Sequence, residues 1–291
     1  MPASPTADLP RPLAVVAHDA GAANLIVAWL DPADPPRSVM RGPAEAIWRA
    51  RMGDAPLADS IAEAIDGAAT MLSGTGWASD LEHEARIAAR AAGIRSIAVL
   101  DHWVNYRPRF ERGGTTVLPD ALWVTDEDAA TIARDAFDLP VALQPNPYLA
   151  AQVAAIRAPR DPAAALYVLE PARSDWGRGT PGEFQALDHF MANRGRLGMR
   201  PHDPVRLRPH PSDPPGKYDA WIARNPPATI DQSASLGDAI DGAGIVVGAE
   251  THAMVVALAA GRRVVCALPP WAPPCRLPQA GIEHLTDRSK A

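Results

Sequence analysis

Short apolar runs alternate with amphipathic stretches along most of the chain, and this alternation limits the possible folds more than any other feature. Runs typical of buried strands lie at residues 12–18, 69–74, 94–100, 121–124, 140–144, 164–170, 204–210, 244–248 and 262–268. Stretches with helical spacing lie between them, at residues 21–30, 79–93, 125–137, 181–195 and 250–261. Strands that alternate with helices form parallel β-α-β units. We therefore predict an α/β protein with two Rossmann-like, doubly wound domains that face each other across a cleft.

The chain is long enough for two domains of ordinary size. Its 291 residues correspond to roughly two domains at about 150 residues each. The segment at residues 158–162 contains two prolines, and the strand-helix pattern restarts after it. We predict an N-terminal domain at residues 1–160 and a C-terminal domain at residues 161–291.

The composition narrows the classes of partner and compartment. A formal net charge of −6 argues against a broad nucleic-acid-binding face, which needs a positive field. No apolar run reaches the ~20 residues of a membrane span, and residues 1–12 lack the features of a secretory signal. We therefore expect a soluble, cytoplasmic protein. Cys266 and Cys275 are too far apart in sequence for a zinc knuckle or a C-x-x-C redox pair, so we interpret them as structural thiols.

Polar side chains gather where the predicted strands end. They are His18 and Asp19, Thr75 and Gly76, Asp101 and His102, Glu170, His210, and Glu250 with Thr251. Ligands of open parallel sheets bind outside the carboxyl ends of the strands. These residues are therefore the candidates for a binding or catalytic site.

Each C-terminal candidate has two interpretations. His210 lies beside Arg208 between two prolines, where a rigid imidazole and a guanidinium would bind a phosphate, or it belongs to a solvated loop. Glu250 and Thr251 stand at a predicted helix N-terminus, which suits an anion. Glu250 could also accept from ribose hydroxyls, or both residues could simply cap the helix.

The N-terminal candidates are equally open. Asp19 follows the first strand, where it would deprotonate a hydroxyl or only cap the next helix. Thr75 and Gly76 lie in a glycine-rich turn that departs from a dinucleotide fingerprint, so we predict a close backbone approach to a ligand or to the other domain. Asp101 and His102 open an aromatic and polar cluster that suits a sugar surface or packing between domains.

A capping box is predicted just after that glycine-rich turn. Ser79 is followed three residues later by Glu82, which matches the S-x-x-E pattern. We expect a helix to begin at Ser79, with the Glu82 side chain folded back onto it.

Two motifs resemble those of the GT-B superfamily, which contains nucleotide-sugar glycosyltransferases and related epimerases. Residues 208–213 read Arg-Pro-His-Pro-Ser-Asp, which is similar to the His-Pro motif of bacterial sialyltransferases and polyol-phosphate transferases. Residues 247–265 resemble the strand-turn-helix element of the same families. The resemblance implies that His210 contacts the nucleotide phosphate. The family's Ser/Thr pair is replaced by Glu250 and Thr251, and Asp19 stands in place of the family's general base.

This resemblance implies a glycosyltransferase of the inverting type in bacterial surface glycan or glycoconjugate synthesis. The expected donor is a nucleotide-activated sugar, with a CMP-linked acidic sugar favoured, and the expected acceptor is a glycan or glycoconjugate. We assign Asp19, Asp101 and His102 to catalysis. Residues of the donor site are Thr75, Gly76, Arg208, His210, Glu250 and Thr251.

Neither a metal nor a cofactor is expected, because the chain's own groups would neutralise the leaving phosphate. Nucleic acid is not an expected partner, and peripheral membrane association stays open. The first alternative is a UDP-GlcNAc 2-epimerase-like enzyme, which would use carboxylates such as Asp101 and Glu127. The second is a non-catalytic module that binds a nucleotide-sugar or a glycan.

Overall fold

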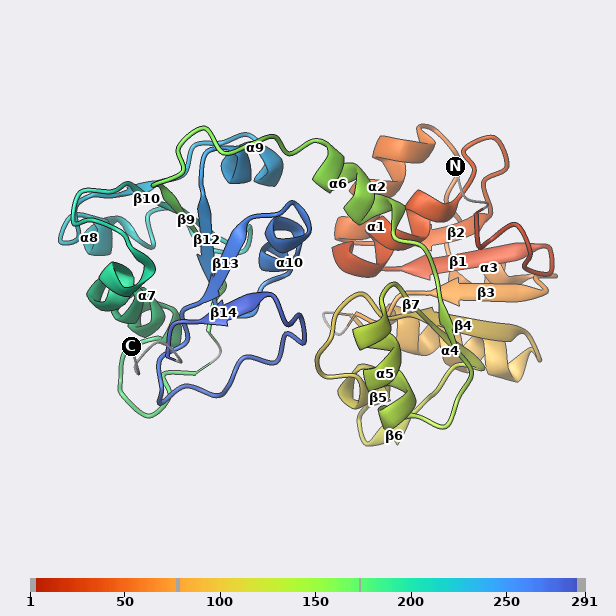
Figure 1. Cartoon of the computed structure of the whole chain (residues 1–291). Helices are drawn as coiled ribbons and strands as arrows, with labels where there is room; N and C mark the ends of the chain where they lie inside the picture. Colours follow the sequence, from red (N-terminus) through yellow and green to blue (C-terminus); the bar gives the residue numbers. More distant parts are fainter. Residues whose placement is uncertain (1–3, 77–78, 173, 287–291) are drawn as a thin grey trace. The chain divides into compact units, whose positions relative to one another are not determined.

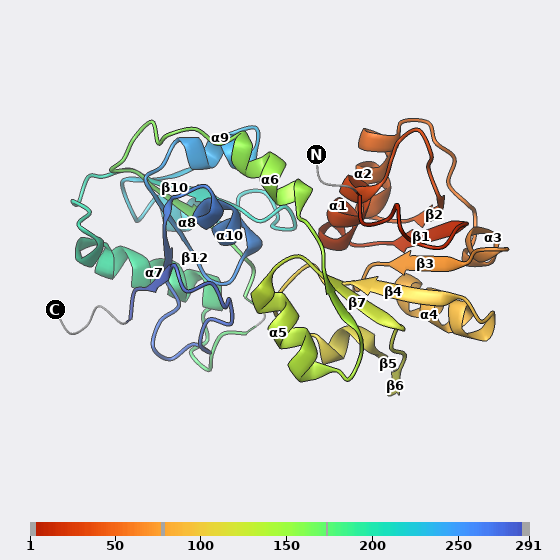
Figure 2. The same ribbon diagram turned by 45° about the vertical axis from the view of Figure 1, so that its right-hand side comes forward.

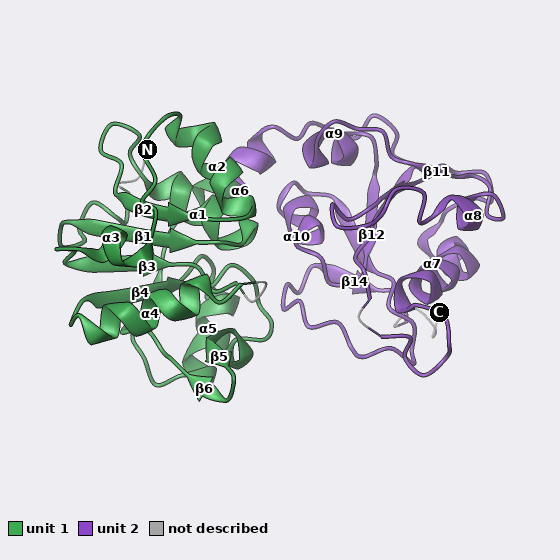
Figure 3. Ribbon diagram, turned by 180° about the vertical axis from the view of Figure 1, so that it is seen from behind, with its two compact units in different colours: residues 1–148 green, residues 149–291 purple. Residues whose placement is uncertain are grey.

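Two parallel sheets of six strands form the framework of the protein (Figure 1). The computed structural model describes residues 4–76, 79–172 and 174–286. The chain divides into two units, Met1–Tyr148 and Leu149–Ala291, coloured separately in Figure 3. The division falls within helix α6 (Pro147–Ala154), so the segment at residues 158–162 belongs to the second unit.

Unit 1 contains the sheet β2-β1-β3-β4-β7-β8. Its strands are β1 (Leu13–Ala17), β2 (Arg37–Met40), β3 (Thr70–Ser73), β4 (Arg95–Val99), β7 (Ala121–Val124) and β8 (Val141–Leu143). Its helices are α1 (Ala20–Trp29), α2 (Pro43–Met52), α3 (Ile61–Ile65), α4 (Leu81–Ala91) and α5 (Glu127–Ala136). Between β4 and β7 the chain forms the short helix η1 (Arg107–Phe110) and the hairpin β5 (Glu111–Arg112) and β6 (Thr115–Thr116).

The central strand β1 is buried on both faces, which explains its continuous apolar sequence. Leu13, Val15 and Ala17 pack in the core beneath α1 and α2. Ala14 and Val16 point to the opposite face and pack with residues of α3 and α4. Figure 2 shows these helices on the two sides of the unit 1 sheet. The alternation of side chains along a strand therefore gives unit 1 two separate cores.

Unit 2 contains the sheet β11-β10-β9-β12-β13-β14. Its strands are β9 (Ala165–Val168), β10 (Val205–Arg208), β11 (Ala228–Ile230), β12 (Ile245–Gly248), β13 (Arg263–Cys266) and β14 (Ile282–His284). Its further helices are α7 (Gly182–Asn193), η2 (Arg194–Leu197), α8 (Asp219–Ile222), α9 (Leu236–Asp241) and α10 (His252–Ala259). Helices α7 and α8 lie on one side of the sheet, and α9 and α10 lie on the other (Figure 3).

The two parallel six-stranded sheets confirm the predicted fold class of two Rossmann-like units. The strands β2, β11 and β14 were missing from the prediction. All three are edge strands of three or four residues, and each pairs with a single neighbour. In the described part of the chain, no helix combines the length and apolar character needed to cross a membrane.

The strand order places one switch point in each sheet, where the chain changes its direction of growth. In unit 1 the switch point lies between β1 and β3. In unit 2 it lies between β9 and β12. Crevices at switch points are the usual ligand sites of such sheets. We therefore expect ligands to bind at these two edges.

Candidate functional site

An imidazole-carboxylate pair lies at the carboxyl end of β1, next to the unit 1 switch point. His18 Nδ1 lies 2.8 Å from Asp19 Oδ1, and the two side chains are 21% and 28% exposed. Asp19 has the extended backbone of an N-cap before α1, but its side chain makes no capping hydrogen bond. An ionised carboxylate only accepts, so His18 carries its proton on Nδ1 and presents the Nε2 lone pair. In this arrangement His18 Nε2 can take up a proton while the Asp19 carboxylate stabilises the charged ring.

Glycines make room for this pair and for a second carboxylate. Gly76 follows β3, and a Cβ there would overlap the Asp19 carboxyl group. A Cβ on Gly21 would overlap the Asp101 carboxylate in the same way. Gly42 adopts a φ of +53°, and a Cβ there would lie 2.6 Å from His18 Nε2. The structure places Gly76 against Asp19 of the same unit, whereas the predicted approach to a ligand or to the other domain stays a prediction.

The Glu82 side chain binds the backbone of His18, which differs from the predicted capping box. Helix α4 begins at Leu81, and its N-cap is Asp80, one residue after the Ser79 of the predicted capping box. The buried Glu82 side chain accepts from the His18 backbone N at 2.8 Å, so it does not fold back onto Ser79. Burial raises the pKa of Glu82 above its ordinary value of 4.5. The carboxyl group therefore fixes the β1–α1 turn at an electrostatic cost.

Asp101 forms an ion pair with Arg109, a buried arginine of the short helix η1. Arg109 Nη1 donates to Asp101 Oδ1 at 2.8 Å and to Thr75 Oγ1 at 3.1 Å. Thr75 in turn donates to the Val99 backbone oxygen at 2.9 Å and is fully buried. Thr75 therefore joins β3 to β4, and its hydroxyl is already engaged within unit 1. Asp101 is neutralised by Arg109, so Asp19 is the better placed proton acceptor.

The next residue, His102, packs against its neighbour. The His102 and Trp103 rings meet edge to face, with their centroids 5.3 Å apart. Trp103 is buried, and its indole N–H donates to both oxygens of Asp126 at 2.9 and 3.0 Å. Asp126 also caps α5 through Ala129 N. This end of the 101–106 cluster is therefore tied into unit 1 packing.

The two arginines of β10 converge on one buried carboxylate in unit 2. Arg206 Nη1 lies 3.1 Å and Arg208 Nη1 lies 2.6 Å from the two oxygens of Asp231, whose side chain is 0% exposed. Arg208 Nη1 also donates to the Ser233 backbone oxygen. Arg208 was predicted to bind a phosphate directly. Its Nη1 is engaged by Asp231 and Ser233, while the side chain stays 25% exposed, and the phosphate role stays a prediction.

His210, beyond the end of β10, is exposed and is fixed by its own turn. Its Nδ1 accepts from Ser212 N at 3.1 Å and lies 2.7 Å from Ser212 Oγ. The neutral ring therefore carries its proton on Nε2 and can donate from there. The turn is anchored by Asp213, which accepts from the His210 backbone N at 2.9 Å and from Lys217 Nζ at 2.7 Å. His210 is the predicted donor residue that the fold leaves most available.

Glu250 and Thr251 are engaged at the unit 2 switch point. Thr251 is the N-cap of α10, and its hydroxyl accepts from Ala253 N at 3.4 Å. Both oxygens of Glu250 are held by Arg276, with Oε2 at 2.7 Å from Nη2. The pKa of Arg276 is raised because Glu250 accepts from it. Thr251 therefore caps the helix, whereas Glu250 forms an ion pair with the loop before β14.

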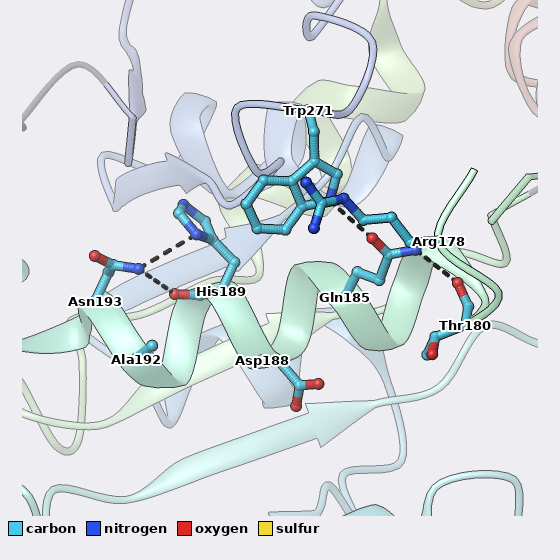
Figure 4. Close-up of a pocket in the computed structure, with 8 residues that line it drawn as sticks. All are labelled: Arg178, Thr180, Gln185, Asp188, His189, Ala192, Asn193 and Trp271. Atoms are coloured by element: carbon cyan, nitrogen blue, oxygen red, sulfur yellow. Dashed lines mark hydrogen bonds between the residues drawn. The ribbon is translucent and has the colours of Figure 1, made fainter. Parts of the chain in front are cut away.

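A pocket of about 500 Å³ lies elsewhere in unit 2, along α7 (Figure 4). Its wall contains Trp271, whose ring is covered by the Arg178 guanidinium 4.0 Å from the ring centroid. The Trp271 indole N–H donates to Gln185 Oε1 at 2.7 Å, and His189 meets the ring edge. None of the predicted site residues lines this pocket.

Several residues that shape the two sites were absent from the prediction. They are Gly42, Glu82, Arg109, Asp231 and Arg276. Glu82 had a sequence signal, but that signal matched a capping box. Asp231 follows β11, a strand that the pattern missed. Arg109 lies in the four-residue helix η1 and Arg276 in the loop before β14, and neither segment is long enough or regular enough for periodicity to indicate the direction of a side chain.

Comparisons with known proteins show which solved structures have a similar fold. No family model matches the sequence, and a search of curated proteins gave no match. Similar solved structures include the UDP-GlcNAc 2-epimerase from Methanocaldococcus jannaschii, with a TM-score of 0.59 and 8% identity over 87% of this chain and 83% of that one. A putative UDP-N-acetylglucosamine 2-epimerase from Listeria monocytogenes gives a TM-score of 0.58 and 14% identity over 88% and 79%.

A third similar structure is the S. aureus MnaA-UDP co-structure, with a TM-score of 0.57 and 8% identity over 88% of this chain and 79% of that one. At such low identity, the likeness concerns the arrangement of strands and helices. The chain therefore has the two-domain, GT-B-type fold of these proteins.

Proposed function

We propose that this protein is an enzyme that acts on a nucleotide-activated sugar, with the His18–Asp19 pair as its base. The observation that carries this proposal is the pair itself. It lies at the carboxyl end of β1, with its Nδ1–Oδ1 contact at 2.8 Å, and two glycines, Gly42 and Gly76, face its side chains closely. Despite this close packing, the two side chains stay 21% and 28% exposed. A substrate hydroxyl can therefore reach the pair from the exposed side.

The pair can remove a proton from a sugar hydroxyl in one step. The hydroxyl proton passes to His18 Nε2, while Asp19 stabilises the imidazolium through the Nδ1 hydrogen bond. Alternatively, Asp19 accepts the proton directly. In both cases the alkoxide oxygen attacks the anomeric carbon, and the bond from that carbon to the phosphate oxygen breaks. Positioned bases of this kind contribute about 10²–10⁴-fold to rate.

Unit 2 would bind the nucleotide. His210 Nε2 donates to a phosphate oxygen, and the ring is held for this by Ser212 and Asp213. Arg206 and Arg208 contribute positive charge in excess of Asp231, since two guanidinium groups share one carboxylate. The N-terminus of α10 adds its dipole. Charge on the leaving phosphate is stabilised by groups of the chain.

The similar structures change the favoured nucleotide from CMP to UDP. Two of them carry the name of an enzyme of UDP-GlcNAc, and the third contains UDP. We therefore propose a UDP-sugar as the first donor to test. A CMP-linked acidic sugar rests only on the His-Pro motif around His210.

Epimerisation at C2 of UDP-GlcNAc is the second candidate reaction, favoured by the fold likeness to two such epimerases. It needs carboxylates that remove and return a proton at carbon. Asp101 is bound to Arg109, and Glu127 lies exposed in the first turn of α5. The local geometry of Asp101 therefore favours glycosyl transfer over epimerisation. A module that binds without reaction is the third candidate.

One experiment separates the three candidates. The reduced protein is incubated with UDP-GlcNAc, UDP-glucose and a CMP-linked sialic acid, with and without a mixed glycan acceptor, and followed by proton NMR. Release of UDP or CMP supports glycosyl transfer, whereas appearance of the C2 epimer supports the second candidate. Asp19→Asn serves as the control for protein-dependent turnover. Tight binding of a nucleotide-sugar without any turnover would overturn the proposed enzyme.

A further inference from the structure

The two cysteines of the chain meet at one backbone carbonyl in unit 2. Cys266 is the last residue of β13, and Cys275 lies in the loop that leads to β14. Their Sγ atoms donate to the Ala249 oxygen at 3.3 and 3.5 Å. The two thiols therefore lie beside the same acceptor atom. The fold therefore brings together two cysteines that lie too far apart in sequence for a C-x-x-C redox pair.

The two thiols differ in access and in acidity. Cys266 is 1% exposed, whereas Cys275 is partly exposed in the loop. When Cys275 is ionised, the Cys266 thiol turns its single proton from Ala249 to the Cys275 sulfur, and this hydrogen bond lowers the pKa of Cys275 and raises the pKa of Cys266. A thiolate is the reactive form of cysteine. Cys275 is therefore the thiol that reacts with an oxidant, and Cys266 is the neighbouring thiol that can form a disulfide with it.

We propose that Cys266 and Cys275 form a thiol-oxidation site that a hydroperoxide converts into an intramolecular disulfide. The Cys275 thiolate attacks one oxygen of the hydroperoxide, the O–O bond breaks, and a sulfenic acid forms as the alkoxide or hydroxide leaves with a proton. The Cys266 sulfur then attacks the Cys275 sulfur. The S–O bond breaks, and water leaves with the Cys266 proton. One hydroperoxide is reduced for each disulfide formed.

The disulfide would act on two features beside it. The segment between the cysteines, residues 267–274, carries Trp271 in the wall of the α7 pocket. The residue after Cys275 is Arg276, which holds Glu250 at the switch point. Both sulfur contacts to Ala249 end when the thiol protons are lost. Oxidation therefore changes the support of the β12–α10 turn whatever reaction the protein catalyses.

The test is a mass measurement on the full chain. The reduced protein is treated with a small excess of hydrogen peroxide, quenched with N-ethylmaleimide and digested with trypsin. Both cysteines fall in one tryptic peptide, residues 264–276, because no Lys or Arg lies between them. We expect this peptide to lose about 2 Da, to bind no maleimide, and to recover two thiols after treatment with dithiothreitol.

Single variants give the matched controls. Cys266→Ala should stop at a Cys275 sulfenic acid that dimedone traps, with a gain of about 16 Da before trapping. Cys275→Ala should leave the buried Cys266 reduced over the time in which the wild type is half converted. The proposal is overturned if wild-type Cys275 proceeds to the +32 Da sulfinic acid without the internal disulfide, or if only disulfide-linked chain dimers form.

Discussion

The two units have the same number of parallel strands, but the charged side chains at their switch points differ in their partners and exposure. In unit 1 the switch point is reached after two strands, and the partly exposed His18 and Asp19 lie there, packed closely against Gly42 and Gly76. In unit 2 the switch point is reached after three strands, and the Glu250 carboxylate there forms an ion pair with Arg276. Similar topology therefore does not produce similar chemistry.

The difference lies in how each unit compensates its charges. Unit 2 satisfies Arg206 and Arg208 with Asp231, which is a structural arrangement inside the unit. Unit 1 leaves both members of the His18–Asp19 pair more than a fifth exposed, whereas the Asp231 carboxylate of unit 2 is fully buried. A buried carboxylate mainly supports the fold, whereas an exposed pair is available to a substrate. We accordingly expect mutations of the His18–Asp19 pair to affect turnover, and mutation of Asp231 to affect stability.

The largest effect is expected at Asp19. Asp19→Asn keeps the size of the side chain and removes the proton acceptor, so turnover should fall by about 10²–10⁴-fold with little change in nucleotide affinity. Stability should be nearly unchanged because the Asp19 side chain does not cap α1. Turnover and urea unfolding are measured on the same preparation. Full activity in a folded Asp19→Asn protein would contradict the assignment of the base.

Gly76→Ala is a second route to the same site. The added Cβ must displace the Asp19 carboxylate, so activity should fall while the charge of the chain stays the same. Gly195→Ala is its matched control, since a Cβ at Gly195 meets nothing within 4 Å. Equal activity of the two glycine variants would show that the precise position of Asp19 is unimportant.

The next largest effect is expected at Asp231, on stability. Asp231→Ala leaves Arg206 and Arg208 without their shared carboxylate, and removal of one member of a buried pair costs about 3–5 kcal/mol of unfolding free energy. The control is Asp66→Ala, an exposed carboxylate 3.9 Å from Arg37, for which we expect a change of at most about 1 kcal/mol. Urea titration measures both values. Similar losses in the two variants would break the contrast between the units.

A smaller effect is expected for nucleotide binding at His210. His210→Ala removes one charge-assisted hydrogen bond and should weaken binding of UDP by about ten- to a hundredfold. Ser212→Ala keeps the backbone N–H that orients the ring, so its dissociation constant should change by less than about threefold. Isothermal titration calorimetry gives both constants. An unchanged affinity in His210→Ala would place the phosphate elsewhere.

The smallest effect concerns the pH dependence of stability at Glu82. Its pKa is raised by burial, so the folded chain keeps this proton to a higher pH than the unfolded chain does. Wild-type stability should therefore fall relative to Glu82→Gln as the pH rises above about 4.5, and the difference should become constant above the raised pKa. Urea midpoints from about pH 4 to about pH 8 measure it. Glu84→Gln, exposed on the same helix, should show no such trend.

The central strands were predictable because they are buried on both faces. The runs at residues 12–18 and 164–170 stand out since every position must be apolar, whichever face it meets. Edge strands do not have this signal. β2 begins with Arg37, and β11 has an exposed threonine, because one side of each strand has no neighbour in the sheet. Sequence patterns therefore report the interior of a sheet better than its borders.

The candidate site was partly predictable for a similar reason. Asp19, Asp101 and His210 follow buried strands, and the strand-end rule finds such residues without knowledge of their partners. The partners themselves come from distant segments. Asp231 lies 23 residues after Arg208, and pairing across two strands has no local pattern. For Arg208, this partner means that part of its charge is compensated within unit 2, and its phosphate role stays a prediction.

The glycines around the His18–Asp19 pair have a consequence for how this protein can vary. A site built from side chains can lose one group and keep the others, but a site shaped by absent Cβ atoms is filled by any replacement. Every single-nucleotide change of a glycine codon that alters the residue gives an amino acid with a Cβ or a stop codon. Gly21, Gly42 and Gly76 therefore have no conservative mutational neighbour. In a saturation mutagenesis screen these three positions at the strand ends of unit 1 should tolerate as little change as the core of β1.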